Sequence, residues 1–109
     1  MKESEVLNHV FHALSDPTRR ELLDKLSQGE YTISELAEPF RMTLAAVSKH
    51  IRVLEEAGLI KRKIDGRIHR CRADLDRLQS ASEFIDRYRK YWEGRLDVLD
   101  AYFKKTGKK

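Results

Sequence analysis

The stretch that decides the fold is TLAAVSKHIRVLEEAG, residues 43–58. Apolar side chains recur in it at steps of three and four residues, so they line one face of a helix. These side chains are Leu44, Val47, Ile51 and Leu54. The Thr43 hydroxyl is suited to cap this helix, and Gly58 stands where a left-handed C-terminal cap is favoured. The opposite face bears Ala45, Lys49, Arg52 and Glu56. Such a face suits a helix that enters a DNA groove, although an ordinary solvated face has the same composition.

The chain has 109 residues, which suits a single domain spanning residues 1–109. It contains no apolar run near the roughly 18 residues of a membrane span, and no signal peptide opens it. We therefore expect a cytoplasmic protein without a membrane partner. The single cysteine, Cys71, cannot form an intramolecular disulfide and suits a reducing compartment.

Positive charge is concentrated in the middle of the chain. Residues 41–73 hold nine Lys and Arg against three Asp and Glu, a net charge of +6. Residues 1–40 hold four against eight, a net charge of −4. This asymmetry favours a polyanionic partner for the middle segment.

Helical periodicity also predicts helices over residues 5–14 and 17–27. Asp16 is a natural N-cap for the second helix, and Pro17 suits its first position. Arg19 and Arg20 follow at once, and we expect them either to bind a phosphate or to remain solvated.

A short helix is predicted directly before the central one. Thr32 and Glu35 form a capping-box pattern that opens it, and Pro39 ends it. Residues 31–33 are compatible with a brief strand. Two short helices joined by three or four residues, the second longer and basic, indicate a helix-turn-helix over about residues 33–57.

After Gly58 the pattern becomes that of β-structure. Two β-prone runs, residues 59–64 and 67–72, flank Asp65-Gly66, a dipeptide that favours a hairpin because both residues can take positive φ. The cations of this hairpin are Lys61, Arg62, Lys63, Arg67, Arg70 and Arg72. A cationic hairpin at about residues 59–73, straight after a helix-turn-helix, is a wing that we expect to lie along the DNA backbone or minor groove.

The rest of the chain predicts a short turn at residues 75–78 and a long helix over about residues 80–105. Its apolar stripe is larger than so small a domain can bury, so we expect it to pair with the same helix of a second chain. The expected dimer interface consists of Phe84, Ile85, Tyr88, Trp92, Leu96, Leu99 and Phe103. We expect the helix over about residues 4–14 to take part as well. Folding back on its own domain is the alternative.

These elements predict a mainly α fold with a small β-hairpin, in which a winged helix-turn-helix precedes a long C-terminal dimerisation helix. Four segments are more specific: FHALSDPTRR (residues 11–20), ISELA (33–37), VSKHIRVL (47–54) and EAGLI (56–60). In this order they resemble the ArsR family of transcriptional regulators. The resemblance covers nearly the whole chain and implies a homodimeric repressor that binds an imperfect inverted repeat in double-stranded DNA, the operator.

For such binding we expect the helix over residues 43–57 to enter the major groove, while residues 61–72 of the wing contact the backbone or minor groove. The expected major-groove residues are Thr43, Ala45, Ala46, Lys49 and Arg52, with Ser48 or His50 at the edge. The expected wing residues are Lys63, Arg67 and Arg70. For His50, a hydrogen bond within the fold is the alternative.

A metal- or thiol-responsive repressor is the alternative function. His9 and His12 lie three residues apart on the first helix, and His69 and Cys71 lie two apart on one strand face. The resemblance implies two common kinds of metal site, one with paired cysteines in the first helix of the helix-turn-helix and one with Asp and His on the last helix. This sequence departs from both patterns, because residues 35–39 lack cysteine and residues 80–105 lack histidine. We therefore expect no metal and no other cofactor. No nucleophile–base pair or phosphate loop stands out, so we expect no enzyme and no catalytic residue.

Overall fold

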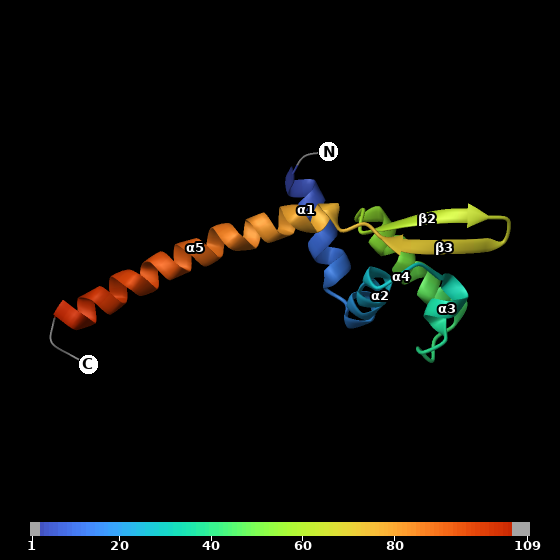
Figure 1. Ribbon diagram of the computed structural model, residues 1–109, viewed down its shortest axis with the longest axis horizontal. Helices are drawn as coiled ribbons and strands as arrows, with labels where there is room; N and C mark the ends of the chain where they lie inside the picture. Colours follow the sequence, from blue (N-terminus) through green and yellow to red (C-terminus); the bar gives the residue numbers. More distant parts are fainter. Residues whose placement is uncertain (1–2, 106–109) are drawn as a thin grey trace.

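The computed structural model describes residues 3–105 (Figure 1). Its elements are α1 (Glu3–Leu14), α2 (Pro17–Ser27), β1 (Tyr31–Thr32), α3 (Ile33–Ala37), α4 (Leu44–Glu56), β2 (Ile60–Asp65), β3 (Ile68–Ala73) and α5 (Asp76–Lys105). The predicted class is therefore confirmed: helices dominate, and a β-hairpin follows a helix-turn-helix made by α3 and α4. The short helix was predicted to end at Pro39, but α3 ends before it, at Ala37.

The core lies between α4 and the helices that precede it. The predicted apolar stripe of α4 is buried at Val47, Ile51 and Leu54, whereas Leu44 at the start of the helix is 54% exposed. Other elements bring Val10, Leu22, Leu36 and Leu59 into the same cluster. Each fully buried aliphatic side chain contributes about 1.5–3 kcal/mol of hydrophobic free energy, so this cluster fixes the position and orientation of α4 in the domain.

Short polar side chains set where the helices begin. Asp16 accepts a hydrogen bond from the Arg19 N–H at the start of α2, and Thr43 accepts one from the Ala46 N–H at the start of α4. Thr32 and Glu35 form the predicted capping box of α3. Gly58 ends the α4 segment with φ +76°, as the sequence predicted. These caps satisfy backbone groups that have no partner inside a helix.

The wing belongs to a three-stranded antiparallel sheet with the order β1-β3-β2. The two-residue loop is Gly66-Arg67, because Asp65 pairs with Ile68. The predicted turn at Asp65-Gly66 is therefore wrong by one residue, and Gly66 alone of the two has positive φ, at +62°. Glycine at the first central position, followed by a residue with negative φ, is typical of a type II′ hairpin.

Helix α5 is continuous from Asp76, so the predicted separate turn at residues 75–78 is wrong. The Asp74 carboxylate accepts a hydrogen bond from the Asp76 N–H at 3.3 Å, and this bond stabilises a helix start four residues earlier than predicted. The helix then extends away from the domain, while the wing lies at the other end of a molecule 70 Å long (Figure 1). Within residues 3–105, no helix has the length and apolarity required to cross a membrane.

Candidate nucleic-acid interface

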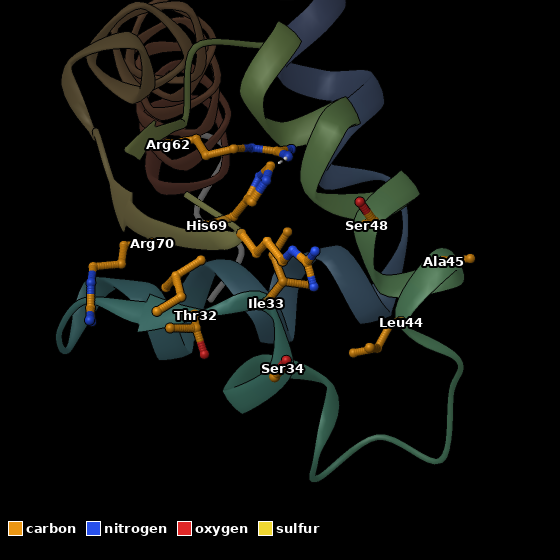
Figure 2. Close-up of a pocket in the computed structure, with 11 residues that line it drawn as sticks. Thr32, Ile33, Ser34, Leu44, Ala45, Ser48, Arg62, His69 and Arg70 are labelled. Carbon is orange, nitrogen blue, oxygen red and sulfur yellow. Dashed lines mark hydrogen bonds between the residues drawn. The ribbon is translucent and has the colours of Figure 1, made fainter. Parts of the chain in front are cut away.

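A groove of about 600 Å³ separates α4 from the wing, and the N-terminus of α3 closes one end of it (Figure 2). It is lined by Thr32, Ile33, Ser34, Leu44, Ala45, Ser48, Arg62, Arg67, Ile68, His69 and Arg70. Four of the predicted DNA-binding residues therefore share one groove. They are Ala45, Ser48, Arg67 and Arg70.

The N-terminal half of α4 presents the predicted small and basic face. Ala45, Lys49 and Arg52 are exposed, whereas Ala46 and Ser48 are half-buried. The Thr43 side chain is exposed, but its hydroxyl is already engaged as a cap, 3.1 Å from the Ala46 nitrogen. The open part of this face is thus apolar and small at Ala45 and cationic one and two turns later.

His50 is held within the fold. Its Nδ1 lies 3.3 Å from Nη1 of Arg19 and 4.0 Å from a carboxylate oxygen of Asp16. Because an arginine can only donate, Nδ1 accepts in this hydrogen bond. The alternative of a hydrogen bond within the fold is therefore the one the structure supports for His50.

Arg19 is buried, which corrects the expectation that it is solvated or binds phosphate. Its Nε donates to the Ala13 carbonyl at 2.8 Å, and its Nη2 donates to the His12 carbonyl at 3.0 Å. The side chain thus caps the C-terminus of α1 and links it to His50 on α4. The backbone N–H of Arg19 also lowers the pKa of Asp16, and the positive charge of the Arg19 guanidinium lowers it further.

The wing cations lie directly opposite one another across the hairpin. Lys63 faces Arg70, and Lys61 faces Arg72, while Arg67 stands in the loop. Like charges in directly opposite positions destabilise a strand pair. Of these five cations, only Lys61 has a close carboxylate among the described residues, that of Asp74 at 3.3 Å. The hairpin is therefore arranged to favour an anionic partner.

Arg62 points the other way and was not predicted as a site residue. Its guanidinium contacts Glu55 of α4 at 3.2 Å and Nδ1 of His69 at 3.1 Å. Its buried Nε has no hydrogen-bond partner among the described residues. The available sequence signal was strand alternation, which separates Arg62 from the exposed Lys61 and Lys63.

The residues of the alternative sensor function lie on two different elements, His9 and His12 on α1 and His69 and Cys71 on β3. Cys71 shares a strand face with His69 as predicted, but it is completely buried, and burial raises the pKa of its thiol. His9 and His12 are exposed on α1. Within the described part of the chain, no three His, Cys, Asp or Glu side chains are grouped so as to hold a metal ion.

Most of the predicted dimer residues form an exposed stripe on α5. Ile85, Tyr88, Trp92, Leu96, Leu99 and Phe103 are each at least half exposed. Phe84 is only partly exposed, because its ring packs edge-on against Phe11 of α1 with 5.7 Å between centroids. The alternative that this helix folds back on its own domain is therefore wrong for the part beyond Phe84.

The fold and the groove define a winged helix-turn-helix, and comparison with known proteins gives the family. Residues 16–62 match the model of the bacterial regulatory proteins of the arsR family. The arsenical resistance operon repressor of Staphylococcus xylosus is 31% identical over 94 residues, which cover 86% of this chain and 80% of the repressor. The transcriptional repressor SdpR of Bacillus subtilis is 43% identical over 54 residues, half of this chain and 60% of SdpR.

Solved structures agree with this result. The crystal structure of an ArsR family transcriptional regulator superposes with a TM-score of 0.79 at 40% identity, covering 83% of this chain and 93% of that chain. A homodimeric winged helix-turn-helix DNA-binding domain from Mycobacterium bovis superposes with a TM-score of 0.63 at 25% identity, covering 74% and 77%. The chain therefore belongs to the ArsR family of bacterial transcriptional regulators.

Proposed function

We propose that the chain acts as a homodimeric repressor that binds an inverted-repeat operator in double-stranded DNA. One observation carries the proposal: Ala45 and Ser48 of α4 lie across one groove from the wing cations Arg67 and Arg70, and the exposed Lys49 and Arg52 continue along α4 outside the groove lining. Residues with small side chains at the start of α4 allow close approach to base edges, and cations on both sides can neutralise phosphates.

Within this proposal the roles divide between α4 and the wing. Ala45 and Ala46 lie against the bases, where Ala45 can contact a thymine methyl group, and Lys49 and Arg52 reach guanine or phosphate. Thr43 and Ser48 lie at the edge, and His50 supports α4 from within the fold. On the wing, Lys63, Arg67 and Arg70 bind phosphates and supply affinity that does not depend on sequence.

The proposed dimer forms through the exposed stripe of α5. The homodimeric M. bovis domain supports the formation of a homodimer. Two copies of α4 then read half-sites about one helical turn, ~34 Å, apart. We propose antiparallel pairing of the two α5 helices, which places the wings at the outer ends of the dimer because the wing and the free end of α5 lie at opposite ends of the molecule (Figure 1).

The test is selection of bound fragments from genomic DNA, followed by salt-dependent binding of the recovered operator. Replacing Lys49 by alanine should cost about 1–3 kcal/mol on the operator and less on random DNA. Replacing Arg67 by alanine should weaken both alike and reduce the salt slope by about one. Lys90→Ala on α5 is the matched control and should change neither. Recovery of no enriched fragment would refute the proposal.

A further inference from the structure

The groove between α4 and the wing has a composition that phosphate binding alone does not explain. Three large aliphatic side chains line it, from three different elements: Ile33 of α3, Leu44 of α4 and Ile68 of β3. Leu44 is 54% exposed and Ile68 is 46% exposed. Aliphatic groups give no stabilisation to a phosphate, so this part of the groove is suited to an apolar group.

Polar and cationic side chains line the same groove, with Thr32 and Ser34 beside Ile33 and with Arg70 apart from Arg62 and His69 (Figure 2). Figure 2 shows Arg62 and His69 together at one end, Ser48 facing them from α4, and Ile33 and Leu44 farther along toward α3. Arg67 and Arg70 add two exposed cations to the lining. The groove thus offers both aliphatic and cationic side chains, and its volume of about 600 Å³ lies within the range of small-molecule sites.

We propose that this groove binds a small amphiphilic organic anion, with its apolar body against Ile33, Leu44 and Ile68 and its carboxylate toward Arg67, His69 and Ser48. Arg62 positions this end of the groove, because its contacts with Glu55 and His69 hold α4 and β3 at a fixed separation. A neutral apolar molecule would leave the cations unmatched, and an inorganic anion would leave the aliphatic wall in contact with water.

Occupancy of the groove has a consequence for DNA binding that rests on the proposed function. The same residues, Ala45, Ser48, Arg67 and Arg70, are the ones proposed to lie against the operator. A ligand in the groove and DNA on its walls therefore exclude each other. The anion would act as an inducer by direct competition, without a change of fold.

The binding test uses the free protein, so it does not depend on an operator. Octanoate and butyrate are titrated into isotopically labelled protein, and amide shifts are followed by NMR, with 1-octanol and inorganic phosphate as comparison ligands. Octanoate should cause saturable shifts at Ala45, Ser48 and Ile68. Each methylene that the groove buries should tighten binding about three- to fourfold over butyrate. Equal binding of 1-octanol or of phosphate, or shifts confined to the aromatic stripe of α5, would overturn the proposal.

Two pairs of variants distinguish octanoate binding in the groove from binding elsewhere on the hairpin. Ile68→Ser and Arg67→Gln should each weaken octanoate binding at least fivefold. Their matched controls are Ile64→Ser and Arg72→Gln, on the same hairpin but outside the groove lining, and these should leave it unchanged. Equal loss in a variant and its control would overturn the assignment.

Competition is then measured on the recovered operator. Octanoate at ten times its own Kd should raise the apparent Kd for DNA about elevenfold. Groove binding without this rise would overturn the inducer role and leave the binding site standing. Absence of operator binding in the first place would refute the proposed function, which is a separate outcome.

Discussion

Arg19 provides the sharpest test of how the domain is held together. It is an arginine with 9% of its surface exposed, and its guanidinium satisfies carbonyls at the end of α1 while contacting His50 on α4. Replacing it by methionine keeps an unbranched side chain of similar length but removes every donor. The carbonyls of His12 and Ala13 then lose their charged partner.

The expected cost follows from these contacts. A hydrogen bond from a charged group contributes about 1.5–3 kcal/mol, and Arg19 donates two of them at 3.0 Å or less. Water can reach part of this region, and neighbouring contacts are not additive, so we expect a loss of about 2–4 kcal/mol. That is a large share of the roughly 5–15 kcal/mol by which a domain of this size is stable.

Urea unfolding followed by circular dichroism measures the loss as a drop in the transition midpoint of about 1–2 M. Both proteins must be compared at one concentration, because dimerisation adds to apparent stability. The neighbouring Arg20→Met is the control, since Arg20 is exposed and, among residues 3–105, its side chain donates only to the Leu14 carbonyl at 2.7 Å. It should cost less than about 1 kcal/mol. Equal losses for the two arginines would refute the role given to Arg19.

Four further predictions follow from single positions. Trp92→Glu on the exposed stripe should convert the proposed dimer to a monomer in sedimentation equilibrium, whereas Lys90→Glu on the opposite face of α5 should not. Gly58→Ala should lower stability by about 1–2 kcal/mol, because φ is +76° there, and thermal unfolding measures it. The Asp16 carboxylate has a lowered pKa in the folded protein, so its contribution to stability is complete above the ordinary pKa of an aspartate and is lost as the pH falls through the lowered pKa. In Asp16→Asn, the free energy of unfolding should depend less on pH over this acidic range. Cys71 should fail to react with a thiol reagent in the native protein and react on unfolding, and rapid native reaction would favour the thiol-sensor alternative.

The parts of the fold that the sequence predicted are those fixed by neighbours along the chain. The α4 stripe, the Thr43 cap, the capping box of Thr32 and Glu35 and the left-handed Gly58 each depend on residues within one or two helical turns. Local signals of this kind survive folding when tertiary packing agrees with them.

The hairpin turn shows where local signals are insufficient. Asp65-Gly66 and Gly66-Arg67 both contain a glycine that can take positive φ, so turn chemistry permits either. A turn at Asp65-Gly66 would pair Arg62 with His69, whereas the observed turn pairs Arg62 with the buried Cys71. Every side chain keeps its face under this shift, but its cross-strand partner changes. The sequence therefore predicted the faces of the wing correctly and its register incorrectly.

The sequence also could not predict the different environments of Arg19 and Arg20 or the residues that line the groove. Arg19 and Arg20 have the same chemistry and neighbouring positions, yet one is buried and the other exposed. What distinguishes them is the position of the α1 carbonyls and of His50, 31 residues away along the chain. The groove likewise joins residues from α3, α4 and the wing. No local pattern could predict these contacts, because they depend on tertiary packing.

Arg62 makes α4 and the wing act as one reading surface. Its guanidinium contacts Glu55, near the C-terminus of α4, and His69 of β3. The wing therefore cannot move away from the helix without breaking the ion pair with Glu55, and His69 helps to hold the guanidinium in place for that pair. In the proposed complex, a wing fixed in this way contacts phosphates at a set distance from the bases that α4 reads. The proposal then assigns the spacing within each half-site to the domain and the spacing between half-sites to α5. An anion between α4 and the wing would meet two walls that already stand apart, so it would compete with DNA without having to open the groove.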